Sequence, residues 1–267
     1  MSKILFCGDI HNKAKRILPQ VDAVIAQQGI DRVVFLGDYV DEFNQGAKKI
    51  IDSAMFLADW VKNKRSNGNL TVNVLMGNHD LPYVVVYQDP GYYQVRNSVA
   101  VSHHSSAQYK LRDIMREMID SVAVYISYQG GAVVASHAGF VKSWSSKIGH
   151  DSIEDLVNKT NNLYKQDSLY ILSWAGQERG GFDPPSPCWA GEHELIKGAV
   201  QGVTQVVGHT PQSGITQRRS AAGDDLWFCD THSWLSEEQR GDGSMLMLDT
   251  GAGEFTVVKS EKWNKLE

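Results

Sequence analysis

Cysteine is scarce in this chain of 267 residues. It has only three, Cys7, Cys188 and Cys229, and no two of them stand in a CxxC spacing. An odd number of widely separated cysteines argues against a disulfide framework, which marks proteins of oxidising compartments. We therefore expect a protein of the reducing cytoplasm.

Long apolar runs are also missing. No stretch of the sequence approaches the roughly 20 consecutive apolar residues that a membrane-spanning helix needs. The first predicted strand begins at Ile4, which leaves too little space before it for a secretory signal. We expect neither membrane insertion nor export of this chain.

Basic residues are too few for a general nucleic-acid-binding protein. Lys and Arg number 26 against 31 Asp and Glu, which gives a formal net charge of -5. Proteins that bind the phosphate backbone normally present a basic face. The sequence therefore carries no strong nucleic-acid signal, and it makes no prediction of the oligomeric state.

Five short apolar runs are the most informative feature that is present. Each is rich in β-branched residues and ends at a glycine or serine, the pattern of a buried strand. The runs are 4–7, 33–36, 72–76, 132–135 and 203–207. With 42% hydrophobic residues the chain has enough apolar surface for one large core.

A polar block with metal-ligand side chains follows each run. In layered α/β folds, strand ends open into the loops that carry chemistry. We therefore expect the five blocks to meet in one dinuclear metal centre. The blocks are Gly8-Asp9-Ile10-His11, Gly37-Asp38-Tyr39-Val40-Asp41, Gly77-Asn78-His79-Asp80, Ser136-His137-Ala138-Gly139 and Gly208-His209-Thr210-Pro211.

Amphipathic segments separate the strands. Apolar residues recur at helical spacing, and the predicted helices are 13–28, 47–64, 108–120 and 153–165. After residue 120 strands dominate, and the further predicted strands are 122–126, 226–229, 244–248 and 255–258. This balance predicts two sheets packed together with helices outside.

The five blocks, in this order, resemble the calcineurin-like metallophosphoesterase superfamily from residue 4 to about residue 250. The last block has a single histidine, followed by Thr210, where nuclease-like branches usually show Gly-His-x-His, and this favours the branch of phosphoprotein phosphatases and diadenosine tetraphosphatases. The resemblance implies an α/β fold, a four-layer α-β-β-α sandwich of two mixed sheets flanked by helices. It implies a single domain over 1–267, with a loop-rich substrate region at about 140–200.

Ligand chemistry supports two ions in the predicted centre. Two metals about 3.5–4 Å apart need an anionic bridge, and Asp38 is our choice. Asp9 and His11 are two residues apart, so in an extended segment both can face one ion. The second ion would use Asn78, His137 and His209.

The metal itself is less well determined by the sequence. Carboxylate, amide and imidazole ligands without thiolate suit Mn, Fe or Zn better than Ca, and the resemblance favours Mn. Each ligand also has an ordinary alternative, because an Asp after a strand can form a turn and a buried His can be a core residue. Asp41 could be the N-cap of the helix that follows it.

The resemblance implies a catalytic pair as well. His79 would protonate the leaving oxygen, and Asp41 would orient its imidazole, while a metal-activated water attacks phosphorus. The substrate would be a phosphorylated molecule, either a phosphoprotein or a nucleotide.

One position departs from the family pattern. Phosphoprotein phosphatases have a phosphate-binding arginine after the second block, whereas this chain has Glu42. Glu42 cannot take that role and would oppose a phosphate dianion at short range. Arg179 is the candidate substitute, in a Gly- and Pro-rich loop at 175–192; loops of this length are usually functional. An ordinary exposed arginine is the alternative.

Four functions remain open from the sequence. The chain could be a serine/threonine-phosphatase-like phosphomonoesterase, a dinucleoside polyphosphate hydrolase, a phosphodiesterase or nuclease, or a non-catalytic metal-binding scaffold. The complete ligand set argues against the scaffold, and low basic content argues against the nuclease. The remaining histidines are predicted to be surface, capping or structural residues: His103, His104, His150, His193 and His232.

Overall fold

Two mixed sheets form the centre of the computed structural model, which describes residues 2–42, 45–97, 103–233 and 241–260. The first sheet has the order β10-β9-β1-β2-β3 and the second β4-β5-β6-β8-β7. The first sheet comprises β1 (Lys3–Cys7), β2 (Arg32–Phe35), β3 (Thr71–Val74), β9 (Met245–Asp249) and β10 (Glu254–Val258). The second comprises β4 (Ala123–Tyr128), β5 (Gly131–Ser136), β6 (Thr204–Val207), β7 (Thr216–Arg219) and β8 (Asp225–Phe228).

Parallel pairing aligns the strands that carry the polar blocks. Strands β1, β2 and β3 run parallel in the first sheet, and β5, β6 and β8 run parallel in the second. Their carboxyl ends therefore open at common edges, where loops can meet. The antiparallel strands β9, β10, β4 and β7 complete the sheets.

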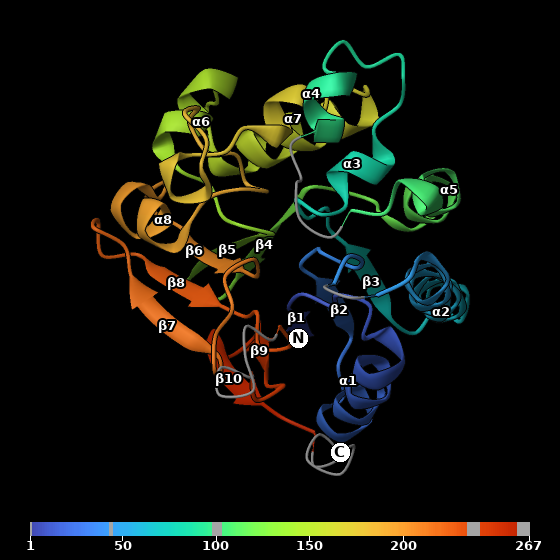
Figure 1. Ribbon diagram of the computed structural model, residues 1–267. Helices are drawn as coiled ribbons and strands as arrows, with labels where there is room; N and C mark the ends of the chain where they lie inside the picture. The colour runs from blue at the N-terminus through green and yellow to red at the C-terminus, as the bar shows by residue number, and fades with distance from the viewer. Residues whose placement is uncertain (1, 43–44, 98–102, 234–240, 261–267) are drawn as a thin grey trace.

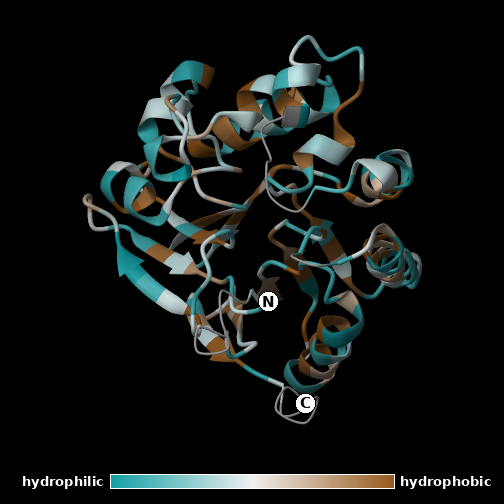
Figure 2. Ribbon diagram, in the orientation of Figure 1, coloured by the Kyte–Doolittle hydropathy of each residue, from teal (hydrophilic) through white to brown (hydrophobic). Residues whose placement is uncertain are grey.

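Alternation along the strands divides the interior into two cores. Val33 and Phe35 belong to the cluster that packs against the helices, while Val34 and Leu36 belong to the smaller cluster between the sheets. Successive side chains of a strand point to opposite faces, so a continuous apolar strand can serve both cores. Figure 2 shows apolar residues on the strands and hydrophilic ones on the outer turns of the helices.

Helices cover the outer faces of both sheets (Figure 1). On the first sheet lie α1 (Ala14–Gln28) and α2 (Ala47–Ser66), with α5 (Gln108–Met118) packed beside α2. On the second lie α6 (Lys142–Ile148) and α7 (Ile153–Lys165), with α8 (Glu192–Gly198) nearby. The predicted two-sheet sandwich with outer helices is therefore confirmed.

Several short elements were not predicted. They are β7, α3 (Leu81–Val84), α4 (Tyr92–Asn97), α6, α8 and the 3-10 turns η1 (Ser105–Ala107), η2 (Tyr170–Ser173) and η3 (Gln177–Arg179). Segments of three to seven residues are too short to show a clear period. Four of them, α6, η2, η3 and α8, give regular structure to the region predicted to be rich in loops.

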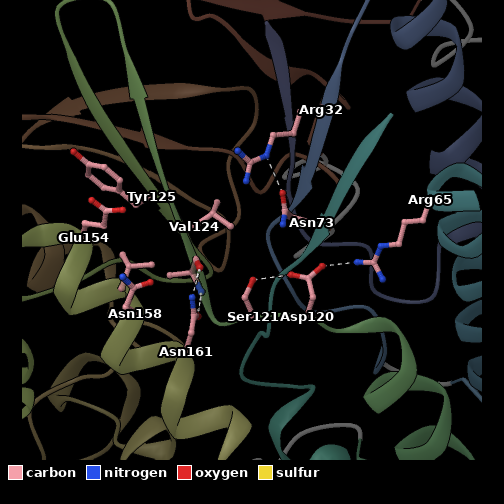
Figure 3. A pocket seen from close by; sticks show the side chains of 12 residues that line it. Arg32, Arg65, Asn73, Asp120, Ser121, Val124, Tyr125, Glu154, Asn158 and Asn161 are labelled. Carbon is pink, nitrogen blue, oxygen red and sulfur yellow. Dashed lines mark hydrogen bonds and ion pairs between the residues drawn. The ribbon is translucent and has the colours of Figure 1, made fainter. Parts of the chain in front are cut away.

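The open edges of β3 and β4 border a polar groove of about 540 Å³ (Figure 3). On one wall, Arg65 Nη2 donates to the carbonyl of Val72 at 3.0 Å. On the other, Asn161 accepts from the amide of Ala123 at 3.0 Å and donates to its carbonyl at 2.9 Å. These side chains occupy edge groups that could otherwise pair with another strand. None of the predicted ligands lines this groove.

Across the described residues, no helix has the length and apolar character needed to cross a membrane.

Candidate metal centre

The ends of β1, β2, β3, β5 and β6 bring the predicted ligands together. Local backbone strain is concentrated there: His11, Asp38, Asp41 and His209 all have positive φ, between 40° and 65°. Non-glycine residues adopt this conformation at a cost, and such residues cluster at functional sites. The turns after β1, β2 and β6 therefore carry this strain at or close to a predicted ligand.

Two glycines allow these turns to approach one another. A Cβ on Gly77 would lie 2.1 Å from Asp38 Oδ1, and one on Gly208 would lie 2.3 Å from Asp9 Oδ1. Each glycine therefore leaves space for a carboxylate that arrives from a neighbouring strand. Gly77 and Gly208, each directly before a predicted ligand, are thus required by packing between blocks.

The first ligand group is Asp9, His11 and Asp38. His11 Nδ1 lies 3.1 Å from the carbonyl of Val40 and 2.8 Å from that of Asp41. A ring nitrogen this close to carbonyl oxygens must carry hydrogen. The other nitrogen, Nε2, faces Asp9 Oδ2 at 3.6 Å and Asp38 Oδ2 at 3.8 Å. Such a carbonyl-oriented imidazole is the usual arrangement of a metal-binding histidine.

The second ligand group is Asp38, His137 and His209, with Asn78 beside it. His137 Nδ1 contacts the carbonyl of Leu36 at 2.8 Å and must donate to it. His137 Nε2 then faces Asn78 Oδ1 at 2.9 Å, His209 Nδ1 at 3.0 Å and Asp38 Oδ2 at 3.3 Å. A proton on Nε2 could be donated to only one of these three acceptors, whereas a cation between them would bind all three together with Nε2 itself.

The electrostatics of the centre favour positive charge. Burial opposes protonation of His11 and His137, yet the carboxylates of Asp9 and Asp38 raise the pKa of His11 to about 10 and that of His137 to about 9. His209 behaves differently, because burial and then His137 lower its pKa, leaving the neutral form that binds metals. The donor set therefore fits two divalent cations, with Asp38 Oδ2 common to both groups.

Asp80 organises the centre and was given no role by the sequence analysis. This fully buried carboxylate accepts hydrogen bonds from the amides of Gly77, Asp38 and Tyr39 at 2.8, 2.9 and 3.1 Å. It thereby joins the ends of β2 and β3. The only local signal is an Asp directly after a Gly-Asn-His turn, since aspartates often accept nearby amide hydrogens.

The predicted pair of His79 and Asp41 lies beside the first group, where the rings of His79 and His11 meet edge-on with 5.3 Å between centroids. His79 Nδ1 is 3.5 Å from Asp41 Oδ2, and the His79 amide donates to Asp38 Oδ1 at 2.9 Å. Asp41 is 1% exposed, while the His79 side chain is 19% exposed. The alternative that Asp41 is a helix N-cap is wrong, because the N-cap of α2 is Gly46.

Comparison with known proteins settles the family of this chain. Residues 2–213 match the family model described as calcineurin-like phosphoesterase. The chain belongs to this family. It is a metal-dependent phosphoester hydrolase, and the donor set of the centre fits this class. A search of curated proteins yielded no match.

Solved structures share the fold of this phosphoesterase. A cold-active protein-tyrosine phosphatase of a psychrophilic Shewanella species aligns with a TM-score of 0.57 and 18% identity, covering 98% of this chain and 81% of that one. A hypothetical protein of Pyrococcus horikoshii OT3 aligns with a TM-score of 0.53 and 11% identity, covering 98% and 88%. At these identities the likeness shows the fold alone.

Arg179 of the phosphoesterase lies at the rim of the centre. Its Nη2 donates to Thr210 Oγ1 at 2.8 Å, and Thr210 directly follows His209. Glu178 holds this part of the loop, because its carboxylate accepts from the amide of His193 at 3.1 Å and contacts the ring Nδ1 at 2.9 Å. Arg179 Nε is buried and has no hydrogen-bond partner among the described residues.

Glu42, the departure from the family pattern, forms an ion pair. Its Oε1 lies 2.7 Å from Lys13 Nζ, and both side chains are largely buried. Lys13 comes two residues after His11, so this cation sits close to the first ligand group. Glu42 is therefore not an uncompensated negative charge facing the substrate.

The remaining histidines belong to neither ligand group. His103 stacks on Tyr83 with 4.7 Å between ring centroids, and His104, which precedes η1, donates its amide to the Tyr83 hydroxyl. His193 is largely exposed and pairs with Glu178. His232 is fully buried, and burial lowers its pKa to about 3.

Proposed function

We propose that this phosphoesterase is a phosphomonoesterase of the phosphoprotein-phosphatase type, and that manganese occupies its centre. The observation that carries the proposal is Asp38, whose Oδ2 faces both His11 and His137 and so belongs to two ligand groups at once. Two bound divalent ions supply Lewis acidity and lower the pKa of a bound water.

The residues of the chain divide the remaining work. Asp9, His11 and Asp38 would hold one ion, and Asp38, Asn78, His137 and His209 would hold the other. His79 Nδ1 faces Asp41, so its other ring nitrogen can give a proton to the leaving-group oxygen. Such proton transfer contributes roughly a hundredfold to ten thousandfold to rate.

Substrate phosphate meets Arg179 at the rim in this proposal. Arg179 lies beside Thr210 with its Nε unused, and a guanidinium binds phosphate through a planar pair of donors. Lys13 neutralises Glu42, which removes the main objection to binding of a phosphate dianion. Arg179 thus takes the place of the arginine that the second block lacks, and Lys13 offsets the charge of Glu42.

A second candidate function is hydrolysis of a dinucleoside polyphosphate. Phe182 follows Arg179 by three residues and is 95% exposed, an unusual position for a large aromatic side chain. Trp189 packs edge-on against His209 at a centroid distance of 6.3 Å. An exposed ring near a phosphate-binding arginine is suited to stacking on a nucleobase.

A substrate panel distinguishes the two candidates. The manganese-loaded protein is assayed with an aryl phosphomonoester, a phosphopeptide, a bis-aryl phosphodiester and diadenosine tetraphosphate. We expect the highest kcat/KM with a monoester, and loss of that activity on addition of a chelator. Faster hydrolysis of diadenosine tetraphosphate, weakened by Phe182→Ala, would favour the second function. Activity on none of the four would contradict both.

A further inference from the structure

A tyrosine hydroxyl lies directly behind the pair of Asp41 and His79. Tyr83, in α3, is fully buried, and its hydroxyl donates to Asp41 Oδ1 at 2.6 Å. The other carboxylate oxygen, Oδ2, is the one that faces His79 Nδ1 at 3.5 Å. The three side chains thus form a line from the interior to the partly exposed imidazole.

The direction of the Tyr83 hydrogen bond is determined by its surroundings. The amide of His104 donates to the Tyr83 oxygen at 2.9 Å, so the hydroxyl hydrogen is left to point at Asp41. Burial raises the pKa of Tyr83, and the charge of Asp41 raises it further. The hydroxyl therefore stays protonated at neutral pH and remains a hydrogen-bond donor.

Packing leaves the Tyr83 ring little freedom. His103 stacks on it at 4.7 Å between centroids with 29° between planes. His103 Nε2 lies 2.9 Å from Gln108 Oε1, and Gln108 Nε2 donates to the carbonyl of Pro82 at 2.7 Å. The ring is thus enclosed by α3, by the residues before η1 and by the start of α5.

Asp41 depends on this contact for its orientation. Its backbone has a φ of 62° and its carboxylate is 1% exposed, so water cannot easily replace a lost donor. Among the described residues, the side chains of Tyr83 and His79 contact this carboxylate. Rotation about the carboxylate bond would turn Oδ2 away from His79, and the short bond to Tyr83 opposes that rotation.

We propose that Tyr83 is a positioning residue, which orients the Asp41 carboxylate so that His79 is held ready to protonate the leaving group. The inference rests on the proposed function, because it needs His79 to be the acid. Tyr83 contacts neither ligand group, so its effect is confined to proton delivery.

Tyr83→Phe tests the inference, because phenylalanine keeps the ring and its stacking on His103 but removes the hydroxyl. Hydrolysis is followed with aryl phosphates whose leaving groups range from nitrophenol to unsubstituted phenol. We expect kcat to fall on the order of tenfold for phenyl phosphate, part of the contribution of a general acid. We expect little change for nitrophenyl phosphate, which leaves without protonation, and unchanged metal content.

Tyr39→Phe is the matched control. The Tyr39 hydroxyl is also buried and also makes a 2.6 Å bond, but to the carbonyl of Leu75. Loss of this hydroxyl should lower thermal stability about as much as Tyr83→Phe does. The dependence of kcat on the leaving group should remain that of the parent. If Tyr83→Phe does not fold, the protein with 3-fluorotyrosine at position 83 is compared with the parent. This residue keeps the hydroxyl, so kcat should depend on the leaving group as it does in the parent.

A double variant decides whether Tyr83 acts through His79. In a His79→Ala background, Tyr83→Phe should have no further effect on kcat, because residues that act as a unit are not additive. An additive effect, or equal impairment with every leaving group, would overturn the inference and leave the proposed function intact. A parent protein that hydrolyses no aryl phosphate would instead contradict the proposed function.

Discussion

The ligand groups and the substrate rim of this phosphoesterase are built in different ways. The carboxylates of Asp9 and Asp38 are each held by a backbone amide from another strand end, His209 and His79 respectively, at 2.9 Å. The rim instead depends on single side-chain contacts, such as that of Arg179 with Thr210. Backbone contacts between strand ends tolerate little change, whereas side chains on a loop can change without disturbing the core. We therefore propose that chemistry and specificity are separable in this protein, and the predictions below test this.

Asp38→Asn should have the largest effect, because it alters both ligand groups. The amide is neutral and cannot offset the repulsion of two cations, so we expect metal content to fall from about two ions per chain and kcat to fall by roughly a thousandfold or more. Elemental analysis of the reloaded protein measures the first change and aryl phosphate hydrolysis the second. Asp225→Asn, on β8, is the control and should retain both ions.

His79→Ala should separate chemistry from metal binding. We expect a fall in kcat of about a hundredfold or more with poor leaving groups, because a general acid is lost. Asp41→Asn should act in the same direction, more mildly. Metal content should match that of the parent in both variants. Loss of an ion from His79→Ala would make His79 a ligand instead.

Asp80→Asn should weaken the contact between the ends of β2 and β3. The carboxylate accepts three amide hydrogens. The NH₂ group of asparagine is itself a donor and cannot accept a hydrogen bond from these amides. We expect a loss of roughly 1–3 kcal/mol in the free energy of unfolding, measured by denaturation of the metal-free protein. Unchanged stability would show that Asp80 is not needed to align the two strand ends.

Metal binding should release protons. Removal of the ions leaves His11 and His137 with pKa values of about 10 and about 9, so both are protonated at neutral pH. A cation displaces these protons, and its apparent affinity should therefore rise with pH up to about 9 to 10. Calorimetry at pH 7.5 in buffers of different ionisation enthalpy measures the release. If the binding enthalpy does not depend on the buffer, metal ions do not displace protons from these histidines.

Arg179→Lys should have the smallest effect, confined to the rim. Lysine cannot reproduce the planar pair of donors, so we expect KM to rise several-fold with kcat nearly unchanged. Arg112→Lys, on the exposed face of α5, is the matched control. Kinetics identical to the parent on every substrate would remove Arg179 from the site, and loss of metal would show that rim and ligand groups are not separable.

The sequence alone determined the strands that carry the blocks and the family to which they belong. A β-branched run closed by glycine and followed by Asp, Asn or His is a local pattern, and parallel strands bring such ends to one edge. The helical spacing of apolar residues is also a local pattern. The long helices α1, α2, α5 and α7 were therefore predicted within a few residues of their observed bounds.

Only the tertiary structure decided how the residues share their contacts. That Asp38 faces two groups, that Asp80 joins two strand ends and that Tyr83 supports Asp41 all depend on residues at least 27 positions apart. The same holds for Arg179, whose partner Thr210 is 31 positions away. Such contacts leave no period or spacing in the sequence, because they arise when separately predictable elements pack against one another.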